Sequence, residues 1–220
     1  MIVYYRISGS QKIKDGQFSN WERSLDNFKS VFRSKIDRIV FVGDNLTPRI
    51  KDHLSQQEDV LYTELGNSGS FKFALEQAIK EDGDQIIYFV EDDYLHRQGS
   101  DVAIVEGLDI SDYVTLYDHA DKYQKPYTNE WGGEPTRVLL TKSTHWKQVS
   151  STCMTFAAKV KTLREDQNII KHYLKSPIPE DWAMFTHLKT NGRKLISSIP
   201  GYATHCLEDY KSPLIDWSKI

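Results

Sequence analysis

Residues 85–97, which read Q-I-I-Y-F-V-E-D-D-Y-L-H-R, indicate the fold class of this chain. The apolar run over residues 86–90 predicts a short strand that is buried on both faces, as in a parallel sheet covered by helices. Three consecutive carboxylates, Glu91, Asp92 and Asp93, follow it. Adjacent negative charges repel one another unless a cation or hydrogen-bond donors gather around them. A divalent cation therefore explains the three acids best, and a solvated strand end that caps a helix is the alternative.

Composition limits the class of protein. The 220 residues predict one domain over residues 1–220, and a net charge of -3 gives no general attraction to nucleic acid or to an anionic membrane. Cys153 and Cys206 lack C-x-x-C spacing, so they predict neither a disulfide framework nor a zinc site and fit a reducing compartment. Because no apolar run is long enough for a membrane span or a signal peptide, we expect a cytoplasmic protein.

Residues 1–98 alternate between strand and helix signals. Strands are expected over residues 2–7, 39–42, 60–65 and 86–90, and helices are expected after Asn20 or Ser19, from Pro48, and over residues 71–79. This alternation predicts an α/β fold with a mostly parallel central sheet flanked by helices. Ligands of such sheets bind at the carboxyl ends of the strands, here after Arg6, Asp44, Gly66 and Val90.

The turn expected over residues 66–70 opens the third helix, and a helix N-terminus offers backbone N–H groups to an anion. The sequence contains neither G-x-G-x-x-G nor G-x-x-x-x-G-K-[ST], so it supports neither the usual dinucleotide-binding fingerprint nor a P-loop. We therefore interpret residues 1–98 as a nucleotide-binding half that lacks both of these phosphate motifs.

Residues 99–220 show a different pattern. Helices are expected over residues 102–108 and 159–174, and strands over residues 113–117, 136–141, 152–157 and 194–199, which predicts a smaller, antiparallel part. A polar and aromatic stretch over residues 120–135, which contains Trp131, predicts a long functional loop. Glu180 and Asp181 precede a further helix, where acids also commonly complement the helix dipole. His205 lies in an expected unstructured tail, and it gains significance only if that tail folds back to the acidic cluster.

Taken together, these motifs resemble those of glycosyltransferases of the GT-A fold, which use a nucleotide-sugar donor. The stretch Glu91-Asp92-Asp93 looks like the D-x-D motif, with Glu in place of the first Asp. The Glu180-Asp181 pair resembles the x-E-D motif that supplies the base in inverting members. The position of His205 is similar to that of the C-terminal metal-binding histidine, and residues 66–70 are similar to the glycine-bearing loop before the donor site.

This resemblance implies a role for each residue. Asp93 and His205 would bind Mn²⁺ or Mg²⁺, while Asp92 or Glu91 would orient the metal or the ribose. Asp181 would be the general base, with Glu180 as the second candidate. The remaining implied residues would hold the base, ribose and sugar of the donor, or would cover the donor and contact the acceptor: Arg6, Asp44, Asn67, Ser68 and Gly69 for the first role, and Trp131 and Trp182 for the second.

The implied activity is metal-dependent transfer of a hexose from a UDP- or GDP-sugar to a hydroxyl group of a glycan or another acceptor. A single displacement would invert the anomeric configuration. Residues 99–220 would then form the acceptor and catalytic half. Two alternatives remain open: a sugar nucleotidyltransferase, for which residues 8–12 (S-G-S-Q-K) are a poor triphosphate loop, and a catalytically silent domain that binds a nucleotide or a carbohydrate.

Overall fold

The computed structural model describes residues 1–9, 16–32, 35–123 and 136–220. Apolar runs of the N-terminal half form neighbouring parallel strands, in the order β3-β2-β1-β4. These strands are β1 (Ile2–Ser8), β2 (Arg38–Asp44), β3 (Val60–Thr63) and β4 (Ile86–Glu91). Every residue of β1 except its last is buried, as expected for a strand that is covered on both faces.

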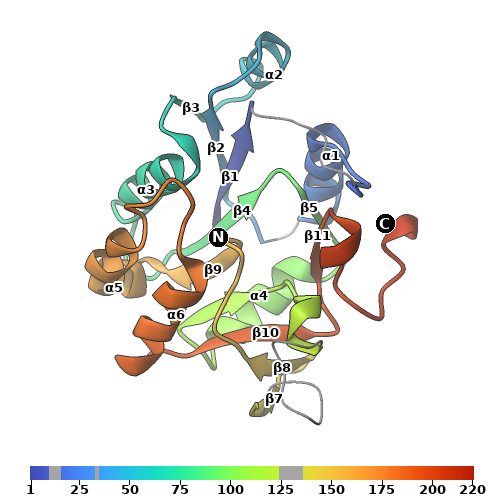
Figure 1. The fold of residues 1–220 in the computed structure, drawn as a ribbon, viewed down its shortest axis with the longest axis vertical. Coiled ribbons are helices and arrows are strands. Elements are labelled where there is room, and N and C mark those ends of the chain that lie inside the picture. The colour runs from blue at the N-terminus through green and yellow to red at the C-terminus, as the bar shows by residue number, and fades with distance from the viewer. Residues whose placement is uncertain (10–15, 33–34, 124–135) are drawn as a thin grey trace.

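Helices cover both faces of this sheet (Figure 1). One face packs against α1 (Trp21–Val31), α2 (Pro48–Leu54) and α4 (Ser100–Leu108), and the other packs against α3 (Gly66–Ala78), α5 (Val160–His172) and α6 (Asp181–Thr190). Because successive side chains of a strand point to opposite faces, Val3 and Tyr5 join the first hydrophobic core whereas Ile2 and Tyr4 join the second. The predicted α/β class is confirmed.

The C-terminal half extends the same sheet in the order β9-β6-β10-β8-β7. Strand β9 is antiparallel to both β4 and β6, β10 is parallel to β6, and β8 and β7 continue in antiparallel fashion. The predicted smaller antiparallel part is therefore confirmed, and one sheet runs through both halves. The bounds are Tyr113–Thr115 for β6, Val138–Leu140 for β7, His145–Gln148 for β8, Phe156–Lys159 for β9 and Leu195–Ile199 for β10.

A second, two-stranded sheet pairs β5 (Tyr94–His96) with β11 (Ala203–His205). The expectation of an unstructured tail at His205 was therefore wrong, because β11 folds back beside the strand that follows the three acids. In the antiparallel register His205 lies opposite Tyr94, the residue after Asp93. Neither strand was predicted, since three residues are too few to show a strand period.

Three other expectations were wrong about where turns, loops and regular elements begin. The strand expected from residue 152 begins only at Phe156, because Cys153 and Met154 adopt φ values of 48° and 58° in a turn. The turn expected over residues 66–70 is instead the start of α3. The loop expected from residue 120 begins with the 3-10 helix η1 (Ala120–Tyr123), and Trp131 lies outside the described residues.

Two further 3-10 helices, η2 (Glu208–Tyr210) and η3 (Trp217–Lys219), follow β11. Trp217 anchors this segment, because its side chain is buried and its indole N–H donates to the carbonyl of Ser212 over 2.9 Å. Among the helices within the described ranges, none is long and apolar enough to cross a membrane.

The amide side chain of Asn27, on α1, makes two hydrogen bonds to the backbone of β5, as a neighbouring strand would. Its Nδ2 donates to the carbonyl of His96 over 2.9 Å, and the His96 N–H donates to its Oδ1 over 2.7 Å. We predict that Asn27→Ala lowers the free energy of unfolding by about 1–3 kcal/mol, because both backbone groups of a fully buried residue lose their partner. Urea unfolding measures the change. Asn168→Ala, at an exposed position of α5, is the control, and equal stability of both variants would contradict the prediction.

Candidate functional site

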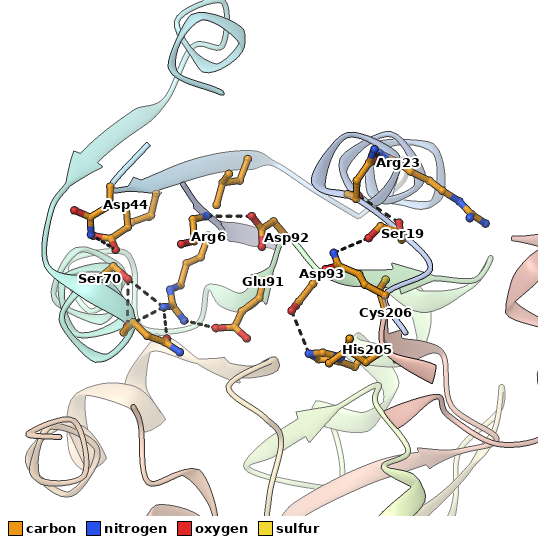
Figure 2. A pocket seen from close by; sticks show the side chains of 18 of the residues that line it. Arg6, Ser19, Arg23, Asp44, Ser70, Glu91, Asp92, Asp93, His205 and Cys206 are labelled. Carbon is orange, nitrogen blue, oxygen red and sulfur yellow. Dashed lines mark hydrogen bonds and ion pairs between the residues drawn. The ribbon is translucent and has the colours of Figure 1, made fainter. Parts of the chain in front are cut away.

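A cavity of about 690 Å³ opens at the carboxyl ends of β1, β2 and β4 (Figure 2). This is the edge of the sheet where the sequence predicts a ligand. Several of the predicted site residues line the cavity: Arg6, Asp44, Asn67, Glu91, Asp92, Asp93 and His205. They come from β1, β2, the start of α3, the end of β4 and β11, so segments that lie far apart in the sequence meet here.

The guanidinium of Arg6 joins three of these segments. Its Nη1 donates to Glu91 Oε1 over 2.9 Å, and its Nη2 donates to the carbonyl and side-chain oxygens of Asn67 over 2.8 and 2.7 Å and to Ser70 Oγ over 3.0 Å. Arg6 is 7% exposed, and its guanidinium carbon lies 5.4 Å from the centre of the Phe71 ring. Burial of a charged arginine is costly unless the guanidinium is paired and hydrogen-bonded. Glu91 therefore faces Arg6 as an ion-pair partner.

The carboxylate of Asp44 fixes the beginning of α3. Its Oδ1 accepts hydrogen bonds from Thr63 Oγ1 over 2.8 Å, from the Leu65 N–H over 2.8 Å and from the Gly66 N–H over 3.2 Å. A carboxylate at this position also complements the positive end of the helix dipole. Asp44 therefore lines the cavity and also holds the first turn of α3, which forms part of the cavity wall.

Asp93 and His205 form the acid–imidazole pair that the sequence suggested. His205 Nε2 lies 3.1 Å from Asp93 Oδ2, and the imidazole ring packs edge-on against Tyr94 at 5.3 Å between ring centres. Figure 2 shows the two side chains next to one another and pointing toward each other. Asp92 turns differently, because its Oδ2 accepts a hydrogen bond from the Ser8 N–H over 3.0 Å. The three acids therefore have three separate environments.

The donor atoms of Asp93 and His205 fit two ligands of a divalent cation. Adjacent ligands of an octahedral Mg²⁺ at about 2.1 Å stand about 3.0 Å apart, close to the 3.1 Å between these two atoms. The other ring nitrogen of His205, Nδ1, is buried and has no hydrogen-bond partner among the described residues. Within the described parts of the chain, no three His, Cys, Asp or Glu side chains gather as a metal-binding group. Mg²⁺ needs only one or two protein carboxylates when substrate phosphates complete its coordination.

The electrostatics of the cavity also favour a cation. Its described lining carries two arginines, Arg6 and Arg23, against the four carboxylates of Asp44, Glu91, Asp92 and Asp93, which leaves a formal charge of -2 when His205 is neutral. Arg23 is partly engaged elsewhere, because its guanidinium donates to the carbonyls of Phe18 and Ile220. The described part of the lining would therefore repel a diphosphate, and a divalent cation would offset this repulsion.

Unpartnered polar atoms gather around the same strand end. Among the described residues, the buried Tyr5 OH, Arg6 Nε, Tyr94 OH and His205 Nδ1 have no hydrogen-bond partner. Burial raises the pKa of both tyrosines, and the charge of Asp93 raises it further, which places both hydroxyl groups near the acids. Most buried polar groups in proteins are hydrogen-bonded, so these four atoms are exceptions that lie close to the end of β4.

The predicted base, Asp181, lies outside the residues that line this cavity. Its Oδ2 accepts from the Thr152 N–H over 2.7 Å and the Cys153 N–H over 3.0 Å, and its Oδ1 accepts from Thr152 Oγ1 over 2.7 Å and the Met154 N–H over 3.4 Å. Burial raises the pKa of Asp181, although these hydrogen bonds oppose the shift. The carboxylate thus holds the turn at residues 152–154. Its two oxygens can accept about four hydrogen bonds, and all four are made here.

The remaining predicted residues lie around the site rather than in its lining. Glu180 is exposed and accepts a hydrogen bond from Ser176 Oγ over 2.9 Å, while the Trp182 side chain is 61% exposed on the first turn of α6. The Ser68 N–H donates to the Pro177 carbonyl over 3.3 Å. At Gly69, an added Cβ would stand 2.6 Å from the Leu65 Cβ, so this glycine permits the close packing at the start of α3. Ser68 and Gly69 do not line the cavity.

Sequence reasoning missed one wall of the cavity. Gln17, Phe18 and Asn20 line it together with Leu207. The Phe18 N–H donates to the Cys206 carbonyl over 3.0 Å, and Gln17 forms an isolated antiparallel bridge with Leu207. This contact joins the start of the chain to the segment after β11, and nothing in the local sequence signals it.

Comparison with solved structures identifies the fold. A structure of GalNAc-T7 with UDP, GalNAc and Mn²⁺ is 12% identical with a TM-score of 0.62, and the alignment covers 95% of this chain and 45% of that one. This chain has a nucleotide-sugar transferase-like fold. CMP:2-keto-3-deoxy-manno-octonic acid synthetase in complex with CTP is 14% identical with a TM-score of 0.53, and 91% of each chain is covered.

The bifunctional IspDF from Campylobacter jejuni is 14% identical with a TM-score of 0.51, and it covers 100% of this chain and 54% of its own. The chain therefore spans about half the length of GalNAc-T7 and of IspDF. No protein-family model and no curated protein matches the sequence. The fold is thus the one that glycosyltransferases and nucleotidyltransferases share, and it does not separate these two activities.

Both thiols have pKa values that suppress their reactivity. Burial raises the pKa of Cys206 to about 12 and raises that of Cys153 well above its ordinary value. Because the thiolate is the reactive form, we predict that iodoacetamide at pH 8 modifies both cysteines of the folded protein more than about 100-fold more slowly than those of the protein unfolded in urea. Intact-mass spectrometry over time measures the rates. Rapid labelling of either folded thiol would contradict the burial described here.

Proposed function

We propose that this protein is a metal-dependent glycosyltransferase that moves a sugar from a nucleoside-diphosphate sugar to a hydroxyl group of a carbohydrate acceptor. The observation that carries this proposal is the Asp93–His205 pair at the end of β4, inside a cavity whose described lining is net negative. The spacing of the two donor atoms suits a divalent cation, which would also offset the negative charge of the described lining when a diphosphate binds. UDP- or GDP-sugars remain the predicted donors, and a cytoplasmic location remains a prediction.

Asp93 Oδ2 and His205 Nε2 would hold the metal, for which Mn²⁺ and Mg²⁺ both suit the oxygen and imidazole ligands. When bound, the cation supplies Lewis-acid neutralisation of the charge that develops on the leaving diphosphate. Asp92, which is fixed by the Ser8 N–H, would orient the ribose. The pairing of β5 with β11 presents the imidazole to Asp93, so the fold prepares the two ligands before the donor arrives.

Arg6, Asn67 and Asp44 would shape the donor-binding end. The Arg6 guanidinium is held by Glu91, Asn67 and Ser70, so it lines the cavity with little freedom to move. Ser68 and Gly69 would act indirectly, because they pack the start of α3 that positions Asn67. Trp182 is sufficiently exposed to stack on a sugar ring, and Trp131 keeps its predicted role in covering the donor or contacting the acceptor.

Asp181 remains the proposed general base, with Glu180 as the alternative. Burial raises the pKa of Asp181, and a raised pKa makes a carboxylate a stronger base. Proton abstraction from the acceptor hydroxyl requires that the carboxylate exchange one of its four hydrogen bonds for that hydroxyl. The Met154 N–H contact, at 3.4 Å, is the longest of the four and is the one to give way. Attack from the face opposite the leaving diphosphate would invert the anomeric configuration.

A sugar nucleotidyltransferase is the second candidate, since CMP:2-keto-3-deoxy-manno-octonic acid synthetase and IspDF share the fold. A triphosphate carries more negative charge than a diphosphate, and the described lining offers only two arginines to receive it. Within the described lining, this balance favours the diphosphate-sugar donor. A domain that binds without catalysis would retain every binding property above and show no turnover with any acceptor.

The first test concerns donor and metal together. We predict that Mn²⁺ with a saturating UDP- or GDP-sugar raises the melting temperature of the protein by about 5–10 °C, and that neither component alone does so. Asp93→Ala should abolish the rise, because the metal loses one of its two protein ligands. Differential scanning fluorimetry with UDP-glucose, UDP-N-acetylglucosamine and GDP-mannose measures it.

Asp26→Ala is the control for this experiment, since Asp26 is an exposed carboxylate on α1. It should respond to donor and Mn²⁺ as the wild type does. The donor site is refuted if no nucleotide-sugar stabilises the wild-type protein in the presence of Mn²⁺.

A second test separates the chemical and structural roles of Asp181. We predict that Asp181→Asn retains the donor- and Mn²⁺-dependent stabilisation but lowers the rate of transfer by about 10²–10⁴-fold, since the amide accepts no proton. The melting temperature without donor should also fall, because an amide cannot accept all four hydrogen bonds.

Thr152→Ala is the matched control, because it removes one of the four donors and leaves the carboxylate in place. It should lower the melting temperature and keep most of the transfer activity. If Thr152→Ala loses as much activity as Asp181→Asn, then Asp181 serves only to hold the turn at residues 152–154.

A further inference from the structure

Five aromatic side chains pack in a closed series that begins and ends at the imidazole of His205. The His205 ring centre lies 5.3 Å from that of Tyr94, which lies 5.5 Å from that of Tyr117. Tyr117 lies 5.0 Å from His119. Tyr210 closes the series, at 5.7 Å from His119 and 5.9 Å from His205. Because His205 lines the cavity, Tyr210 contacts a lining residue directly and His119 lies one ring further away.

The sheet topology independently places His119 on the same side of the molecule as the acids. Strand β9 is antiparallel to both β4 and β6, so β4 and β6 run in the same direction. His119 follows the carboxyl end of β6, just as Asp93 follows the carboxyl end of β4. The two residues therefore lie at the same edge of the sheet, which is the edge where ligands of such sheets bind.

The imidazole of His119 is held at one of its two nitrogens. Its Nδ1 lies 2.8 Å from Asp121 Oδ1 and 3.1 Å from the backbone nitrogen of the same residue. In the parts of the chain that the structure describes, no group forms a hydrogen bond with Nε2. An imidazole that is fixed through Nδ1 presents Nε2 in a defined direction, ready to exchange a hydrogen bond with a ligand.

Tyr210 combines a fixed position with an exposed ring. The hydroxyl of the buried Tyr117 donates to the Tyr210 carbonyl over 2.6 Å, which holds η2 against the end of β6. The Tyr210 residue is nevertheless 46% exposed, and Leu207, which precedes η2, lines the cavity. A tyrosine held in this way offers an apolar surface beside the cavity at little cost in side-chain freedom.

We propose that Tyr210 and His119 bind the acceptor saccharide, with Tyr210 packed against the apolar face of a sugar ring and His119 Nε2 hydrogen-bonded to one of its hydroxyl groups. A sugar ring presents C–H groups on its faces and hydroxyl groups around its edge, so an aromatic ring beside an imidazole nitrogen suits both. This inference rests on the proposed glycosyl transfer and adds acceptor-binding residues to it. Asp181 keeps its proposed role as the base.

The test measures binding of methyl β-glucoside, methyl β-galactoside and methyl α-mannoside to the full chain by saturation-transfer difference NMR. At least one of the three should bind to the wild type. Tyr210→Ala should raise its Kd by about 3–10-fold through loss of the aromatic contact, whereas Tyr210→Phe should bind as the wild type does. His119→Ala should raise the Kd by about 3–10-fold through loss of the hydrogen bond.

Tyr62→Ala is the matched control, because Tyr62 on β3 is 47% exposed, nearly the same fraction as Tyr210. This variant should bind the methyl glycoside as the wild type does. Since Tyr210 packs against His205, the rise in melting temperature with nucleotide-sugar and Mn²⁺ is measured on the same proteins, and it should persist in Tyr210→Ala. If that variant loses both this rise and sugar binding, Tyr210 only supports His205 and the proposal is overturned.

Three other results would overturn the proposal: no binding of any of the three glycosides to the wild type, an unchanged Kd in Tyr210→Ala, or an unchanged Kd in His119→Ala. Displacement of the bound glycoside by a nucleotide-sugar with Mn²⁺, but not by the nucleoside diphosphate with Mn²⁺, would assign the rings to the donor sugar and also overturn it. Each of these results leaves the donor site intact if a nucleotide-sugar with Mn²⁺ stabilises the wild type. Absence of that stabilisation refutes the donor site itself.

Discussion

The buried guanidinium of Arg6 is the constraint on which the site depends. A cation that is 7% exposed at the end of a parallel strand needs hydrogen-bond acceptors. Glu91 at the end of the neighbouring strand and Asn67 and Ser70 at the start of α3 supply them. Loss of one partner would leave a buried charge uncompensated, which is far more unfavourable than loss of an exposed ion pair. One side chain therefore ties the end of β1 to the end of β4, beside which it is already paired, and to the first turn of α3. Asp44 adds to this by receiving the first N–H groups of the same helix.

Much of the architecture follows from local sequence. The apolar runs that become β1, β2, β3 and β4 are long enough to predict strands. The amphipathic spacing of Trp21, Leu25 and Phe28 predicts α1. Once strands and helices alternate, the right-handed crossover rule and the position of ligands at strand ends place Arg6, Asp44 and the acids 91–93 at one edge. The resemblance that these motifs carry then implies Asp93 and His205 as partners, and the structure brings these two side chains within 3.1 Å.

The remaining features depend on contacts between distant parts of the chain. Strands β5 and β11 have three residues each, so only their mutual pairing makes them strands. The turn at residues 152–154 reads as part of a strand in the sequence, because the positive φ angles of Cys153 and Met154 are imposed by the carboxylate of Asp181 on α6. In the same way, the separate environments of Glu91, Asp92 and Asp93 are set by Arg6, Ser8 and His205, none of which adjoins them in sequence.

The antiparallel pairing of β5 with β11 has a consequence for how the molecule is assembled. Asp93 is in place as soon as the first four strands form, whereas the imidazole that completes the pair comes from the last strand of the chain. A partly folded N-terminal half would thus carry the acids without their histidine, and the metal site that we propose would be complete only once the final strand has paired. A ligand that contacts both Asp93 and His205 would stabilise the native state relative to any folding intermediate in which β11 is unpaired. Ligand binding and the pairing of β11 with β5 are therefore thermodynamically linked.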